Sequence, residues 1–394
     1  MPLCAVLALT FGCGDPSGSD DLGNLDGGGV EPGDGGSGGG PGYDIVFDSN
    51  VLHEIQITVD DGDLDALESD RENRVPCTFS FDGVELSNVG VRQKGGLGSS
   101  STLDGKPGFS VKFNEFVAGQ KLHGLRKLLL NNALEDATLL SEHIGYESYR
   151  LAGRPATFTA HAVVTLNGRV YGVYVVKEPI NVDFLERSFG SASADGNVYE
   201  GNYHPDDQQL GDFVIHPEEL DLKDEVEDMR SRAGAVALAA AIRDTPDAQF
   251  SGVVSGRLDL DGYITSLALD TVLGYWDSYA YFLNNYYLYD NPADGRFVYL
   301  PHGMDQLQYE TLSAPFGELA DRIEENAALD AQFRDEIARV RSTFAVAALQ
   351  ARIDRVDAIL HATPRTESAV LEDIASFDSR VDGVRAAISA IPNQ

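Results

Sequence analysis

The sequence predicts an α+β fold, with a strand-rich N-terminal half and a mainly helical C-terminal half. Apolar and polar residues alternate over 53–60 and over 109–113, the period of half-buried β-strands. From Phe316 onward the chain is rich in alanine and indicates helices. Hydrophobic residues make up 43% of the chain, enough to fill a large core.

The first half divides into short elements separated by turn signals. The strongest of these signals is Asn167-Gly168, a dipeptide typical of tight hairpins. Gly153 and Pro155 end the longest predicted helix, which Asp136 could cap. The predicted elements are strands at 53–60, 78–81, 88–94, 109–113, 160–166 and 170–177, with helices at 63–71 and about 137–152.

The second half begins with an irregular, acidic stretch at about 191–217. Helical patterns follow at 233–243 and 260–273. Two further strands, 284–290 and 296–300, are separated by a turn-forming segment and predict a second hairpin.

The first 13 residues indicate a targeting segment. The apolar run Leu3–Gly12 ends at Cys13 and resembles a bacterial lipoprotein signal, although Thr10 stands where a leucine is usual and no basic residue precedes the run. Residues 14–43 form a Gly/Asp-rich linker, and 44–394 form the folded domain. We therefore expect an extracytoplasmic lipoprotein anchored at the cell envelope through Cys13, or otherwise a secreted protein.

The charge balance excludes some partners. The chain carries 29 basic and 63 acidic residues, a formal charge of −34. This charge repels nucleic acid and favours cations or basic polypeptides. We expect contact with a membrane only through the lipid anchor. Cys77 is the single cysteine of the predicted domain, and we interpret it as a small core residue.

Several segments, each weak alone, occur in a specific order. Together they resemble the spore-coat-protein-H (CotH) kinase family over roughly residues 44–315. The segments are Val91–Gly95 followed by serines, Lys106–Phe113, Leu128–Asn132 with Glu135-Asp136, Leu166–Glu178, Tyr275–Asp277, Asn284–Tyr289 and Leu300–Asp305.

This resemblance implies an atypical protein-kinase-like fold of two lobes around an ATP cleft. The N-terminal lobe, about 44–180, would be β-rich, and the C-terminal lobe, about 181–394, mainly helical. It further implies a kinase that uses ATP and Mg²⁺ (or Mn²⁺) to phosphorylate Ser or Thr of a surface or matrix protein. Given the acidic chain, we expect that substrate to be basic and rich in Ser and Thr.

The candidate ATP site begins at the loop 95–101. Its glycines would let backbone N–H groups approach phosphate oxygens, and its hydroxyls add donors. Lys112 lies opposite the apolar residues of its strand and is the first candidate for a phosphate-pairing cation, with Lys94 as the alternative; an exposed strand lysine would show the same pattern. The loop residues predicted to contact ATP are Gly96, Ser99 and Ser100.

Glu142 lies near the start of the predicted helix and, in a kinase-like arrangement, would pair with Lys112. A helix N-terminal acid favoured by the macrodipole is an equally good interpretation. Glu178 is the alternative partner for the lysine.

Asp277 and Asp305 flank the second predicted hairpin, so folding of this hairpin would bring Asp305 near Asn284. In the order seen in kinases, Asp277 would accept the substrate proton and Asp305 would bind Mg²⁺, with Asn284 or Asn285 as a further ligand.

The sequence departs from the family pattern at the second acid. Where the family usually has Trp-Asp-x-Asp, this chain has His302-Gly303-Met304-Asp305. Loss of one carboxylate at Gly303 could remove a metal ligand. The competing hypothesis is therefore a catalytically inactive, surface-anchored binding or structural module.

Overall fold

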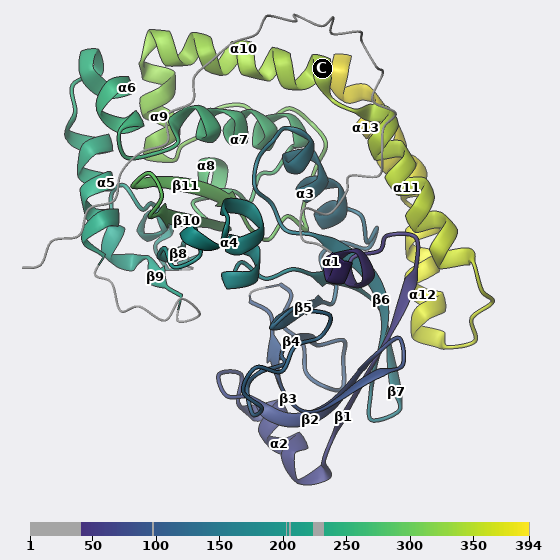
Figure 1. Cartoon of the computed structure of the whole chain (residues 1–394). Helices are drawn as coiled ribbons and strands as arrows, with labels where there is room; N and C mark the ends of the chain where they lie inside the picture. Colours follow the sequence, from purple (N-terminus) through teal and green to yellow (C-terminus); the bar gives the residue numbers. More distant parts are fainter. Residues whose placement is uncertain (1–40, 97, 202, 205, 224–231, 394) are drawn as a thin grey trace, which may run out of the picture. The chain divides into compact units, whose positions relative to one another are not determined.

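The computed structural model describes residues 41–96, 98–201, 203–204, 206–223 and 232–393. All of these residues belong to one compact unit (Figure 1). The predicted leader 1–13, including Cys13, and the predicted linker up to residue 40 lie outside the described residues.

The N-terminal part of the unit is a closed β-barrel, with strands in the order β1-β2-β3-β4-β5-β7-β6. β1 pairs with β6 in parallel and closes the barrel, and the other neighbours are antiparallel. The strand bounds are β1 Leu52–Val59, β2 Val75–Phe81, β3 Val84–Lys94, β4 Gly108–Lys112, β5 Lys127–Asn131, β6 Thr159–Leu166 and β7 Arg169–Lys177.

Alternation along the strands decides which side chains fill the barrel. Phe109 and Val111 of β4 are fully buried and pack in the barrel core with Val89 and Val91 of β3. The residues between them, such as Ser110, point to the outer face, because successive side chains of a strand lie on opposite sides. Cys77 is 5% exposed in this core, and burial raises the pKa of its thiol to about 12, as expected for a structural cysteine.

Three helices accompany the barrel strands in the chain: α1 Pro41–Val46, α2 Asp61–Ser69 and α3 Ser141–Leu151. α3 begins four residues later than predicted. Leu139 has a positive φ of 60°, so the chain turns before the helix, and Asp136 accepts a hydrogen bond from the Ser141 N–H at 2.7 Å. Asp136 therefore accepts a bond from the first N–H of α3 but lies five residues before the helix begins.

A second sheet has the strand order β11-β10-β8-β9. The predicted hairpin 284–300 is present, with Tyr286 of β10 opposite Pro301 of β11. β8 arises from the stretch predicted to be irregular and pairs with β10. The bounds are α4 Val182–Phe189, β8 Val198–Gly201, β9 Asp221–Leu222, β10 Tyr286–Asn291 and β11 Arg296–Pro301.

Helices make up the rest of the C-terminal half. α7 is buried along almost its whole length and packs against α10 and β11 (Figure 1). The helices are α5 Ala233–Asp244, α6 Asp247–Ser255, α7 Leu260–Leu273, α8 Tyr279–Phe282, α9 Glu318–Glu325, α10 Ala327–Thr343, α11 Val346–His361, α12 Ser368–Asp378 and α13 Val381–Ala390. None of the helices within the described ranges is long and apolar enough to cross a membrane.

The C-terminal helices return to the barrel. α12 packs along β7, and α11 contacts α3 (Figure 1). The Asp373 carboxylate of α12 accepts two bonds from the Lys106 ammonium, at 2.8 and 2.9 Å, and one from the Val173 N–H at 2.7 Å. The end of the chain therefore braces the segment that follows the 95–101 loop.

The predicted α+β class is confirmed, with the strand-rich part before the helical part. Most predicted elements match the structure within a few residues, including the hairpin at Asn167-Gly168, whose residues have φ of 47° and 82°. The sequence did not predict that β1 pairs with β6 in parallel. It also did not predict the strands β5, β8 and β9.

Candidate active site

A cavity of about 840 Å³ lies between the barrel and the second sheet. Its walls come from the 95–99 loop, the segment between β5 and α3, the end of β7, β8, and the segments 276–285 and 302–306. Among the described residues that line it, seven are carboxylic acids and two are lysines, Lys94 and Lys177. The cavity is therefore a strongly acidic space with two cations on one wall.

The loop after β3, called the Gly/Ser loop for Gly95, Gly96, Gly98 and Ser99, forms one edge of the cavity. Gly95 has a φ of 124°, and a Cβ there would come 2.7 Å from the Ser99 carbonyl oxygen, so the turn requires glycine. The Asn132 amide donates to the Ser99 carbonyl at 2.8 Å and to the Lys106 carbonyl at 2.7 Å. Of the loop residues predicted to contact ATP, Gly96 and Ser99 line the cavity, whereas Ser100 is exposed and does not line it.

The buried cation of the site is Lys177, at the end of β7. Its ammonium donates to Glu142 Oε1 at 2.7 Å, and each side chain is only 3% exposed. Burial alone would lower the pKa of Lys177, but the Glu142 carboxylate holds it above its ordinary value. Burial would likewise raise the pKa of Glu142, yet Lys177, Asn131 and Lys94 hold it below its ordinary value.

The prediction that Glu142 pairs with Lys112 is wrong. Lys112 instead contacts Glu115 at 3.0 Å, with 37% of its side chain exposed, and does not line the cavity. Outward positions of β4 alternate as Gly108, Ser110 and Lys112, and Gly108 lies at the cavity. Lys112 lies four residues beyond Gly108, which corresponds to about 13 Å along the strand. The alternation identified the correct face of the barrel but not the correct end of it.

Lys94, the alternative candidate, does line the cavity. Its ammonium donates to the Asn131 side-chain oxygen, and the Asn131 amide donates to Glu142 Oε2 at 2.5 Å. Burial, together with the charge of Lys177, lowers the pKa of Lys94 to about 8, while Glu142 opposes that shift. Glu178, the other proposed lysine partner, instead accepts hydrogen bonds from Arg187 at 2.7 and 3.1 Å.

Asp277 lines the same cavity and lies in the segment between α7 and α8. The Asn284 amide donates to one of its carboxylate oxygens at 3.2 Å, and the Asn285 amide to the other at 2.5 Å. Burial raises the pKa of Asp277 to about 6, although the two amides oppose the shift. The carboxylate is therefore held in place and still accepts protons near neutral pH.

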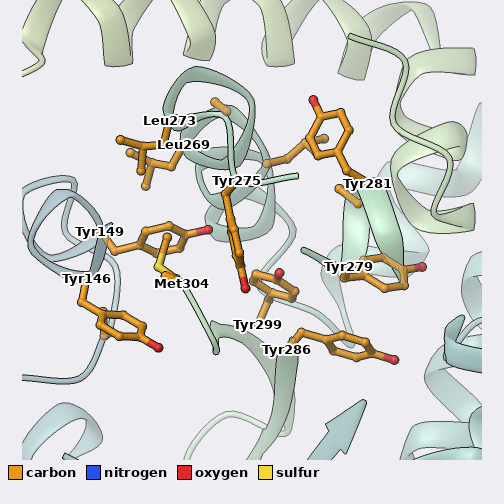
Figure 2. Packing of buried hydrophobic residues seen from close by; sticks show 14 of the residues in the cluster. Tyr146, Tyr149, Leu269, Leu273, Tyr275, Tyr279, Tyr281, Tyr286, Tyr299 and Met304 are labelled. Carbon is orange, nitrogen blue, oxygen red and sulfur yellow. The ribbon is translucent and has the colours of Figure 1, made fainter. Parts of the chain in front are cut away.

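Asp305 follows β11 and lies close to the Lys177–Glu142 pair. Burial and the Glu142 carboxylate raise the pKa of Asp305 to about 7, against the effect of Lys177. This proximity arises because α3, which carries Glu142, packs closely against the segment that carries Asp305. A Cβ at Gly145 of α3 would come 2.9 Å from Cε of Met304, the residue before Asp305. Figure 2 shows Met304 in one buried cluster with Tyr146 and Tyr149 of α3.

Gly303 occupies the position where the family usually has an acid. It has a φ of 60°, and a Cβ there would come 2.5 Å from Asn285 Oδ1. Asn285 itself has a φ of 54°. The backbone at 303 is therefore fitted against the amide that holds Asp277, and a carboxylate in this position would displace Asn285.

The cavity wall offers oxygen donors of the kind that suit one magnesium ion. Mg²⁺ is commonly held by one or two carboxylates together with substrate phosphates and water. Asp305 could supply a carboxylate, and Asn284 or Asn285 an amide oxygen, since all three residues line the same cavity. A nearby cation would also offset the negative charge that raises the pKa of Asp305.

Sequence reasoning missed Lys177, Asn131 and Asn132. Lys177 did carry a signal, because it is a single lysine that closes the otherwise apolar strand Val170–Val176 immediately after a hairpin. The two asparagines belong to the segment Leu128–Asn132 that resembles the family, but no local pattern indicated their roles, which depend on how β5 and the residue after it lie beside the Gly/Ser loop.

The fold and the site together have the features of a kinase-like protein: a β-rich part, a helical part, and a buried Lys–Glu pair that shares one cavity with two aspartates. The family model described as "CotH kinase protein" matches residues 91–388. The chain therefore belongs to the CotH kinase family, as its motifs indicated.

Proteins similar to the chain include a spore coat protein and a kinase of known structure. Inner spore coat protein H of Bacillus subtilis (strain 168) is 25% identical over 199 residues, which cover 48% of this chain and 52% of that protein. The chain thus matches about half the length of this relative. The crystal structure of the Helicobacter pylori proinflammatory kinase CtkA covers 72% of this chain and 94% of its own, with 10% identity and a TM-score of 0.29. That score is too low to transfer any feature of the kinase to this chain.

Proposed function

We propose that the protein is a phosphotransferase that moves the γ-phosphoryl group of ATP to a Ser or Thr hydroxyl of a protein substrate outside the cytoplasm. The observation that carries the proposal is the buried Lys177–Glu142 pair, which shares one cavity with Asp277, Asp305 and a Gly/Ser loop. Phosphoryl transfer depends mainly on positioning and charge stabilisation, and these groups supply both.

The residues take distinct roles. Lys177, fixed by Glu142, and Lys94 pair with phosphate oxygens beside the backbone of the Gly/Ser loop, including Gly96 and Ser99. Asp305, with Asn284 or Asn285, would hold Mg²⁺ or Mn²⁺, and the metal would neutralise charge on the transferred phosphoryl group.

Asp277 orients the acceptor hydroxyl and takes its proton. The acceptor oxygen bonds to the γ-phosphorus, the bond from that phosphorus to the β,γ-bridging oxygen breaks, and ADP leaves. A pKa of about 6 leaves Asp277 mostly ionised at neutral pH, so it can act as the base.

The acidic cavity and the chain charge of −34 favour a basic acceptor segment. Anchorage through Cys13 and a place at the cell envelope stay part of the proposal. The resemblance to a protein named for the spore coat supports a location outside the cytoplasm.

One observation favours a second function, that of an inactive binding or structural module. Gly303 leaves the site without the first acid of the family pattern, and its backbone fills that space against Asn285. A module of this kind would keep the fold and the anchor but transfer no phosphate.

Label transfer distinguishes the two functions. The full chain is incubated with γ-labelled ATP, Mg²⁺ or Mn²⁺, and a lysine- and serine-rich peptide. The phosphotransferase predicts labelled peptide from the wild type and a loss of at least about a hundredfold in Asp277→Asn and Asp305→Asn. No transfer by a folded wild type with either metal would favour the inactive module.

A further inference from the structure

A second cavity, of about 610 Å³, adjoins the first. It lies against the outer face of β3–β5, the segment 178–180 that follows β7, and the strands β8 and β9. Lys94, Lys177 and His302 line both cavities, so the two spaces meet at the lysine wall of the candidate active site.

The charge of this second cavity is opposite to that of the chain. Within the described part of the chain, six of its lining residues are cationic and three are carboxylic acids. The first cavity has seven acids and two lysines, and the whole chain carries −34. The cations of the second cavity are Arg71, Arg92, Lys94, Lys127, Lys177 and Lys223.

Two of these cations are held by neutral groups. Arg92 donates from Nη1 to the Arg71 carbonyl oxygen at 2.5 Å. Arg71 donates from Nη2 to Gln93 Oε1 at 3.2 Å and to the Ser101 carbonyl oxygen at 3.0 Å. These bonds fix both guanidinium groups in position without cancelling their charge.

His302 lies at the boundary of the two cavities, with its Nε2 3.6 Å from Glu200 Oε1. Lys223 pairs with Glu200 and lies 5.9 Å over the Tyr287 ring. An anion placed among these cations would relieve their mutual repulsion.

We infer that the second cavity is an anion site for a polyphosphate group. Guanidinium forks at fixed positions suit the geometry of phosphate oxygens, and the adjacent lysines add point charges. The polyphosphate could be the tail of the nucleotide in the proposed function, reaching past Lys94 and Lys177, or a separate phosphoanion bound beside that nucleotide. The first source rests on the proposed function, and the second does not.

Calorimetry of the full chain with inorganic tripolyphosphate tests the site. The inference predicts saturable binding by the wild type. Binding should weaken about tenfold or more in the double variant Arg71→Gln/Arg92→Gln, because the variant lacks the charged hydrogen bonds from both guanidinium groups to the probe. Lys112→Gln removes a cation from the same barrel face outside both cavities and should leave binding unchanged.

Lys223→Gln provides a second variant, because Arg71 and Arg92 also bond to backbone oxygens and their replacement could unfold the barrel. It should weaken tripolyphosphate severalfold, with the melting temperature showing that the protein is folded. Absence of saturable binding, or equal binding by the wild type, the double arginine variant and Lys223→Gln, would overturn the inference.

Competition with ATP and Mg²⁺ then identifies the source. If ATP displaces tripolyphosphate and the arginine variant weakens both ligands, the site holds the nucleotide tail. If tripolyphosphate binds equally to the ATP-loaded protein, the site holds a separate anion. Binding of tripolyphosphate by a wild type that binds no ATP would defeat the proposed function while leaving the anion site standing.

Discussion

Two lysines on barrel strands, Lys177 and Lys112, each pair with a glutamate at a similar distance but in very different surroundings. Lys177 and Glu142 are 2.7 Å apart and each 3% exposed, whereas Lys112 and Glu115 are 3.0 Å apart with 37% and 29% exposure. A buried pair stabilises only as long as both partners remain, because each charge has lost its water. An exposed pair remains solvated and contributes little. Burial, rather than residue type, therefore separates a candidate site pair from a surface pair.

Of these substitutions, removal of Lys177 should lower the free energy of unfolding the most. Lys177→Met leaves the Glu142 carboxylate buried without its cation, which should cost about 3–5 kcal/mol of unfolding free energy. Urea unfolding at pH 7 measures the loss. Lys177→Met combined with Glu142→Leu should recover much of it, since an apolar pair leaves no buried charge. Equal losses in the single and double variants would show that the charge is not the cause.

The Lys106–Asp373 pair is intermediate, with side chains 15% and 22% exposed. Asp373→Asn removes the charge but keeps the size, and should cost about 2 kcal/mol because three bonds to the carboxylate weaken. Faster proteolysis within 95–107 should accompany the loss, since Lys106 lies in the segment that Asn132 ties to Ser99. A stability loss with unchanged cleavage would mean that α12 does not brace the loop.

Asp270 is a buried acid whose side chain bonds to a hydroxyl group instead of a cation. It accepts a hydrogen bond from Tyr149, and burial raises the pKa of Asp270 to about 8. The unfolded value is about 4, so between these values the folded state holds a proton that the unfolded chain has lost. Stability should therefore fall as pH rises across this window, by about 1.4 kcal/mol per pH unit or about 3 kcal/mol between pH 5 and 7.5.

Asp270→Asn should flatten that slope, whereas Asp335→Asn on the exposed face of α10 should leave it unchanged. Thermal unfolding at several pH values measures both. A slope in Asp270→Asn that equals the wild-type slope would assign the pH dependence to other groups.

The exposed pair should respond least. Lys112→Met should change the unfolding free energy by less than about 1 kcal/mol, because water already solvates both groups. Its effect should also shrink at high salt, where exposed charges are screened. A loss comparable to that of Lys177→Met would erase the difference between the two pairs.

The sequence predicted the parts of the fold that depend on local pattern. Alternation located most barrel strands, and Asn167-Gly168 located a hairpin, because the signals lie within a few residues. The β1–β6 pairing joins segments about a hundred residues apart, and nothing local specifies it. β8 was missed because a four-residue strand in a polar stretch has too few positions for a pattern.

The same limit applies to the site. The hairpin argument predicted that Asp305 would lie near Asn284, and both residues line the first cavity just beyond the paired strands. Asp277 also lines this cavity, but it lies before α8, where the hairpin register does not place it. Alternation placed Lys112 on the outer face of the barrel but could not show where the C-terminal lobe covers that face. Lys177 lies under that cover and Lys112 does not. The difference between the two lysines depends on tertiary contacts, and the only local hint is that Lys177 closes an otherwise apolar strand.

Nucleotide binding by the matched methionine variants is the most direct test. The full chain is titrated with ATP and Mg²⁺ by calorimetry as wild type, Lys177→Met and Lys112→Met, at a temperature where all three are folded. We expect binding by the wild type and by Lys112→Met, and a loss of about a hundredfold or more in Lys177→Met. Binding that survives in Lys177→Met but fails in Lys112→Met would contradict the assignment of the buried pair to the nucleotide site.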